Sequence, residues 1–186
     1  MNYLPMLDKI WNDYEFQKKS LALVKRTVIY NAQHSENIVT PKLLLKAGLS
    51  DVSVEMIDRD SLSAKESLQG FVVLSIWVVF ERLLIEFLQK LIATDVAIVV
   101  DNSTRQMLIE QVRNDVERWK PDMMLDMVKP VITADTVGTL KKIKRHRDWI
   151  AHRNPAATPE KIDPRTAYEL VREAARQIEQ SQSIIL

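Results

Sequence analysis

The chain has 186 residues, of which 46% are hydrophobic and 27% are charged, and its formal net charge is only +1. This composition is ordinary for a soluble globular protein, and the length predicts a single domain over residues 1–186. The absence of cysteine excludes disulfides and thiolate metal sites. Three glycines supply few tight turns, which favours long helices over sheets. We therefore predict an all-α domain of about six or seven helices with an antiparallel bundle core.

Two stretches bear on where the protein resides. The N-terminal sequence MNYLPMLDKIWNDYEF has no basic region followed by an apolar core, so it is not expected to be a signal peptide. Residues 71–80 are the most apolar run, but charged residues interrupt its continuation too soon for a membrane span: Glu81, Arg82, Glu86 and Lys90. We expect a cytoplasmic protein without a membrane partner.

The N-terminal part of the chain predicts a long helical segment and a short one. Apolar residues recur at helical spacing over Leu4–Gln33, which indicates one long helix or two short ones. Thr40 resembles an N-cap and Gly48 a helix stop, so a short helix is expected over Pro41–Ala47. Residues 49–61 show no clear period, and we interpret them as a solvated connector.

A longer helix is predicted to follow this connector. Ser63 and Glu66 have the spacing of a capping box, which indicates a helix start, and the helix should continue to about Val96. Within it, Glu81 lies on an otherwise apolar face made by Leu74, Trp77, Leu84, Ile85 and Leu88. An unpaired buried carboxylate is very costly, so Glu81 needs a partner. It either forms a structural ion pair or orients a residue of the basic stretch described below.

The next segment predicts two shorter helices. Ser103 begins a second capping box, so a helix should run from there to about Trp119. Pro121 then opens a short helix. Pro130 breaks the chain after it.

Two helices complete the expected fold. Asp135 or Thr136 should cap the first, which ends near Arg153 because Pro155 disfavours helical conformation at the residue before it. A loop over 155–162 leads to the last helix, which Asp163 should cap.

The helix that ends near Arg153 carries a dense basic stretch over 141–155, KKIKRHRDWIAHRNP. Its net charge is local, because the whole chain is almost neutral. Clustered Lys and Arg side chains attract phosphate, and a histidine among them can move protons near neutral pH. We therefore expect Lys141, Lys142, Lys144 and Arg153 to contact phosphate groups, such as those of RNA. Arg147 instead falls on the apolar face of its helix, between Ile143 and Ile150, and is the natural partner of Glu81.

Arg147–His152 resembles the R-x4–6-H signature of the HEPN superfamily, in which a polar residue usually follows the arginine, as Asp148 does here. Arg145 also fits the spacing, with six residues before His152. The resemblance implies an all-helical, HEPN-like fold and a metal-independent endoribonuclease that works as a dimer, without a cofactor. It implies Arg147 and His152 as catalytic residues, with Arg145 as the alternative arginine.

The spacing constrains how such a site is built. On one straight helix, Arg147 and His152 point about 140° apart and lie about 7.5 Å apart along the axis, so they do not easily bind one phosphate. Either the helix ends or distorts between them, or two copies face each other across a dimer. Asp148 and Arg145 share a helix face with His152, so Asp148 could orient the imidazole. The electronegative helix end favours the protonated imidazole.

Two functions follow from these residues. In the first, paired histidines cleave RNA by acid–base attack of the ribose 2′-hydroxyl, in a toxin–antitoxin or other defence setting. Its partners would be RNA, a second copy of the chain, and an antitoxin or a nucleotidyltransferase. In the second, the chain is a non-catalytic helical module that binds RNA, a nucleotide or a partner protein, and Arg147 only pairs with Glu81.

Overall fold

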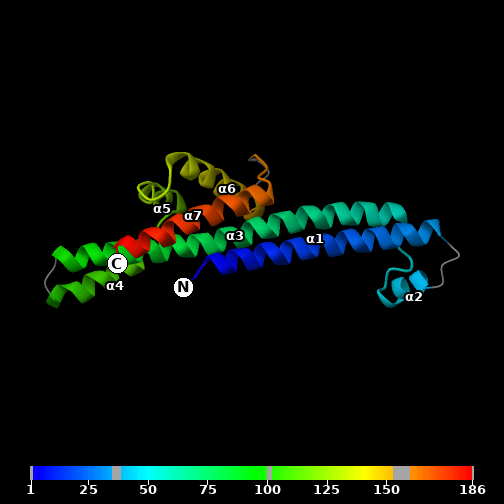
Figure 1. Ribbon diagram of the computed structural model, residues 1–186, viewed down its shortest axis with the longest axis horizontal. Helices are drawn as coiled ribbons and strands as arrows, with labels where there is room; N and C mark the ends of the chain where they lie inside the picture. The colour runs from blue at the N-terminus through cyan, green and yellow to red at the C-terminus, as the bar shows by residue number, and fades with distance from the viewer. Residues whose placement is uncertain (1, 35–38, 100–101, 153–159, 186) are drawn as a thin grey trace. The chain divides into compact units, whose positions relative to one another are not determined.

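The computed structural model describes residues 2–34, 39–99, 102–152 and 160–185, and over these ranges the secondary structure is helical, without strands. This confirms the predicted all-α class. Seven helices are present in the described ranges (Figure 1): α1 Leu4–Gln33, α2 Val39–Lys46, α3 Val54–Val99, α4 Asn102–Val116, α5 Pro121–Met127, α6 Ala134–His152 and α7 Pro164–Ile185.

Most helix boundaries lie close to the predicted ones. α1 is one continuous helix of 30 residues. α2 begins two residues before Pro41 and ends at Lys46, one residue before the predicted Ala47. Gly48 follows the helix, and its φ of 68° is the left-handed conformation that glycine adopts readily. The amide of Leu49 donates to the Leu44 carbonyl at 2.8 Å and that of Gly48 to Leu45 at 3.1 Å, a Schellman-type ending.

The predicted start of α3 is wrong. The helix begins at Val54, nine residues before Ser63, and the stretch interpreted as a connector is helical from that point. Ser53 is the actual cap, because its hydroxyl accepts a hydrogen bond from the Met56 amide at 3.2 Å. Ile57 is buried against Val28 of α1, and this packing stabilises the extra helical turns. Ser63 is exposed inside the helix.

The C-terminal helices differ from prediction by at most a few residues. α4 ends at Val116, three residues before Trp119. α6 begins at Ala134, and Thr133 caps it by accepting the Thr136 amide at 3.3 Å, so neither of the two predicted residues is the cap. Asp163 caps α7 as predicted, since its Oδ2 accepts two amides, at 3.0 and 3.1 Å. The side chains of the predicted caps Thr40 and Ser103, and residues 155–159 of the predicted loop, lie outside the described residues.

Contacts divide the chain into two compact units, so the single domain stays a prediction. The first unit combines Met1–Lys9 with Val73–Leu186, and the second is Ile10–Val72. In the first unit, α6 packs against both α5 and α7, and Figure 1 shows these helices side by side. The buried residues that α3 contributes to this unit are all apolar: Val73, Ile76, Trp77, Val79, Phe80, Leu83, Leu84, Phe87 and Leu88.

Within the first unit, side-chain hydrogen bonds connect the beginning of α1 to α7. Asp8 accepts hydrogen bonds from the Arg172 guanidinium and from the Tyr168 hydroxyl, both at 2.7 Å. Hydrogen bonding to Arg172 is the main reason why the pKa of Asp8 lies below its usual value. In the second unit, α1, α2 and α3 meet at a small core of Val28, Leu44 and Ile57. No helix in the described ranges combines the length and apolar character that crossing a bilayer requires.

The two serines at the start of α3 provide a test of its boundary. Ser53→Ala should lower the free energy of unfolding by about 1 kcal/mol, because it removes an N-cap. Ser63→Ala should raise it by about 0.4 kcal/mol, because alanine is the better residue inside an exposed helix. Urea denaturation followed by circular dichroism measures both. If Ser63→Ala lowered the free energy of unfolding more than Ser53→Ala, the helix would begin at Ser63, as the capping box predicts.

Candidate functional site

Helix α6 is the scaffold of the candidate site. It buries Val137, Leu140, Ile143 and His146 within the first unit. The helix is continuous through His152, its last residue, so it neither ends nor breaks between Arg147 and His152. Of the two arrangements considered for these side chains, only the one that uses two copies remains compatible with α6.

Arg147 connects α6 to α3. Its Nη2 donates to Oε2 of Glu81 at 2.5 Å, and its Nη1 donates to Oδ1 of Asp148 at 2.9 Å. The indole Nε1 of Trp77 donates to the same Glu81 oxygen at 3.1 Å, and the guanidinium lies 5.7 Å from the centre of the Trp77 ring. The predicted partnership of Glu81 and Arg147 is therefore confirmed. Their side chains are only 25% and 19% exposed, so solvent screens this pair less than a surface pair.

Asp148 serves the arginine and a lysine rather than the histidine. Its Oδ1 accepts from Arg147, and its Oδ2 lies 3.1 Å from Nζ of Lys144. The carboxylate that the sequence offered as an orienting group for His152 is thus engaged one turn earlier in the helix.

The three lysines expected to contact RNA are each next to a carboxylate. Lys141 donates to both oxygens of Asp126 at 2.8 Å, and Lys144 donates to Asp122 at 2.9 Å. Lys142 lies 3.3 Å from Glu160. In this structure the positive charge of the lysines is therefore largely compensated.

Helix α5 supplies the two aspartates that sequence reasoning missed. Asp122 and Asp126 are four residues apart on that helix, so both can face α6. Burial alone would lower the pKa of Lys144, but its hydrogen bonds to Asp122 and Asp148 raise it above the usual value. Hydrogen bonds from Lys129 and then Lys141 lower the pKa of Asp126. The sequence signal was the pair of aspartates, spaced one helical turn apart, in the short helix before the basic stretch.

The exposed members of the basic stretch are fewer than expected. Arg145 and His152 are both exposed, and their separation of seven positions places them on nearly the same face of α6. Arg153 lies outside the described residues. Arg145, His152 and the paired Lys142 are thus the basic groups that α6 presents most openly to a ligand.

His146 is a buried polar residue to which the sequence assigned no role. It is only 7% exposed, and its Nδ1 has no hydrogen-bond partner among the described residues. Its ring stacks on Trp149 with 6.1 Å between centroids. Burial, followed by the positive charge of Lys161, lowers the pKa of His146 below its ordinary value of 6.5. The sequence indicated this burial through the position of His146, three residues after the buried Ile143 and therefore next to it on the helix surface.

Comparisons with known proteins bring no relative to this site. No family model, no curated protein and no solved structure matches the chain. Within the described residues, no group of three or more His, Asp or Glu side chains is arranged to hold a metal ion. The resemblance to the HEPN superfamily therefore rests on the sequence of Arg147–His152.

Removing the charge of Glu81 tests how much the contact between α3 and α6 stabilises the protein. Glu81→Gln should lower the free energy of unfolding by about 1–2 kcal/mol, because Arg147 loses its charged acceptor in a partly buried site. Glu169→Gln is the matched control, since it breaks an exposed pair with Arg165 and should cost at most about 0.5 kcal/mol. Urea denaturation gives both values. Equal losses in the two variants would show that the Glu81 contact is no stronger than a surface pair.

The buried His146 predicts a specific dependence of stability on pH. Its pKa in the folded protein is below 6.5, so as the pH falls from 6.5 towards that value the unfolded chain takes up protons more readily than the folded one. The histidine therefore contributes a loss of stability in this window and none above it. His146→Leu should flatten this part of the profile, measured by urea denaturation between pH 5 and 8. Parallel profiles for the variant and the wild type would contradict the inference.

Proposed function

We propose that the chain is a metal-independent endoribonuclease of the HEPN type that acts as a homodimer. The observation that carries the proposal is the exposure of His152 at the last position of α6, five residues after an arginine that two carboxylates hold in place. A histidine at a helix end, next to cationic side chains, has the surroundings that acid–base chemistry on a phosphodiester needs.

The proposed reaction uses one imidazole from each subunit. His152 takes the proton of the ribose 2′-hydroxyl, and the 2′-oxygen attacks the phosphorus. The partner subunit's His152 donates a proton to the departing 5′-oxygen, so the products carry a 2′,3′-cyclic phosphate and a 5′-hydroxyl. General acid–base catalysis of this kind contributes about 10²–10⁴-fold to the rate. Arginine stabilises the negative charge that develops on the phosphate.

Two arginines compete for this last role. Arg147 occupies the motif position, and Glu81 and Asp148 fix its guanidinium. Arg145 is exposed and shares the face of His152. We assign the role to Arg147, which Glu81 positions. Arg145 is the alternative, and substituting each arginine in turn distinguishes the two.

Phosphate binding by the lysines would replace ion pairs that already exist. An exposed pair such as that of Lys142 with Glu160 is worth only about 0–1 kcal/mol, so a polyanion can displace its carboxylate. Lys142 is the most accessible, since its side chain is 50% exposed and that of Glu160 is 70% exposed. We further propose a cytoplasmic toxin or defence role, with an antitoxin or a nucleotidyltransferase as a partner.

Cleavage of single-stranded RNA in EDTA tests the proposal. The wild-type protein should generate 5′-hydroxyl ends, and the same sequence made as DNA should stay intact because it lacks the 2′-hydroxyl. His152→Ala should reduce the rate by at least about 100-fold. His34→Ala is the control, because it removes an exposed histidine outside α6 and should leave the rate unchanged. Arg145→Gln and Arg147→Gln, compared in the same assay, identify the working arginine.

The outcome that rejects the enzyme is simple to recognise. RNA that stays intact with folded, dimeric protein would remove the proposal, and so would cleavage that survives in His152→Ala. A monomer by light scattering would remove the paired-histidine mechanism, because a single α6 keeps Arg147 and His152 on different faces.

A non-catalytic module is the second candidate, and one observation favours it. The guanidinium of Arg147 and the ammonium groups of Lys141, Lys142 and Lys144 already have carboxylate partners, as a structural role requires. RNA binding without cleavage, lost when the three lysines are changed to glutamine, would support a binding module. Absence of RNA and nucleotide binding would support an interaction with a partner protein.

A further inference from the structure

The second unit contains a pocket between α1 and α3, with a volume of about 340 Å³. Each helix contributes four residues with the spacing i, i+3, i+4 and i+7, which places them on one face. From α1 they are Lys18, Leu21, Ala22 and Lys25, and from α3 they are Asp58, Ser61, Leu62 and Lys65. The volume falls within the range of about 300–1,000 Å³ that small-molecule sites occupy.

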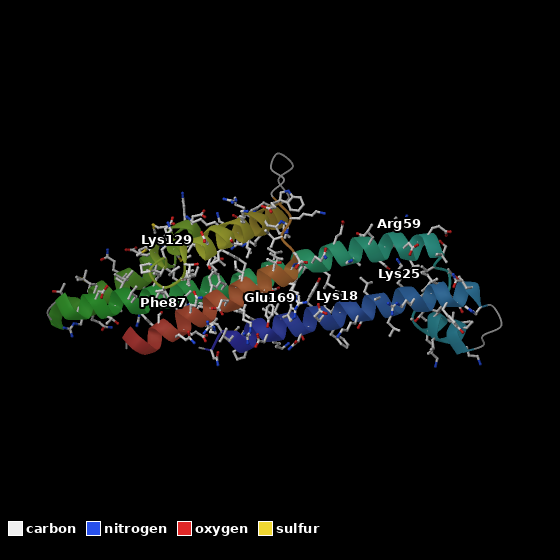
Figure 2. The ribbon with its side chains drawn as sticks, turned by 45° about the horizontal axis from the view of Figure 1, so that its top comes forward. Lys18, Lys25, Arg59, Phe87, Lys129 and Glu169 are labelled. Carbon is white, nitrogen blue, oxygen red and sulfur yellow. The ribbon has the colours of Figure 1, made fainter. Side chains whose placement is uncertain are left out.

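Charge is distributed unevenly along this pocket. At one end, Nζ of Lys25 lies 2.8 Å from Oδ1 of Asp58 and neutralises it. The two helices run antiparallel here, so Lys18 and Lys65 each lie about 10 Å along their helix from that pair, at the other end. Figure 2 labels Lys18 and Lys25 on α1. The three lysines and one aspartate give the lining a formal charge of +2.

The two lysines at the basic end differ in their partners. Lys18 forms an ion pair with Glu15 of its own helix, and Glu15 does not line the pocket. Lys65 is exposed, and among the described residues it forms no ion pair. An anion in the pocket would therefore contact the ammonium group of Lys65, which has no carboxylate partner among the described residues. It would also contact that of Lys18, whose partner Glu15 lies outside the pocket.

The middle of the pocket suits an organic group rather than a bare ion. Leu21, Ala22 and Leu62 supply apolar walls. Ser61 is only 7% exposed, and its hydroxyl has no hydrogen-bond partner among the described residues. A buried hydroxyl without a partner is costly, and a change of its rotamer would turn it towards a ligand.

We propose that this pocket binds a small organic phosphate, with the phosphate between Lys18 and Lys65 and its organic part against Leu21 and Leu62. A phosphate monoester carries a charge of about −1.5 to −2 at neutral pH, which matches the +2 of the lining. The volume suits a molecule of about mononucleotide size. The site uses none of the residues proposed for RNA cleavage, and it stands whether or not the chain is a nuclease.

Titration of the full-length protein with phenyl phosphate, followed by amide chemical shifts, tests this site. We expect saturable binding with the shifts confined to residues near 18–25 and 58–65. Inorganic phosphate and benzyl alcohol should each bind at least about fivefold more weakly, since one lacks the apolar part and the other the charge. Lys65→Gln should weaken binding of phenyl phosphate about fivefold, because the exposed ammonium contributes a partly screened interaction.

Lys42→Gln is the matched control, since it removes an exposed lysine of α2 that does not line the pocket, and its affinity should equal that of the wild type. Circular dichroism confirms that both variants are folded. The proposal is overturned if phenyl phosphate shows no saturable binding at concentrations up to about 10 mM, since weaker binding than this would not indicate a specific site. It is also overturned by equal affinities of the Lys65→Gln and Lys42→Gln variants, or by benzyl alcohol that binds as tightly as phenyl phosphate.

Discussion

The contact between Glu81 and Arg147 is the interaction on which the arrangement of the candidate site depends. Glu81 lies among buried residues of α3, where a carboxylate without a partner would be strongly unfavourable. Arg147 and the Trp77 indole both donate to it, which satisfies the carboxylate and fixes the side of α6 that faces α3. With that side fixed, the face that carries Arg145 and His152 is turned to solvent.

The same contact limits what α6 can do by itself. An arginine bound to two carboxylates has fewer donors left for a phosphate, and the nearby lysines pair with acidic side chains. The density of positive charge in the sequence is therefore greater than the charge that a ligand would meet. If this helix cleaves RNA, the phosphate needs groups from a second copy, or it must displace weak surface pairs such as that of Lys142.

The sequence predicted the parts that local chemistry decides. The pairing of Glu81 with Arg147 could be predicted because each lies on an apolar face and needs a partner of opposite charge. Ser63 was mistaken for a helix start because its capping pattern is local, whereas α3 is extended by the packing of Ile57 against another helix. The pairing of Lys144 with Asp122 depends on how α5 lies on α6, which no local pattern specifies.

Ion pairs also distinguish the two proposed anion sites, one along α6 and one in the pocket between α1 and α3. At α6 an incoming phosphate replaces carboxylates that already neutralise the lysines, so the net gain per contact is small and binding must be spread over several groups. In the second unit, Lys65 has no carboxylate partner among the described residues, and apolar walls lie beside it. The salt dependence of binding grows with the number of phosphates that lysine and arginine side chains neutralise. A small phosphate in the pocket would therefore lose less affinity with added salt than a polyanion held along α6.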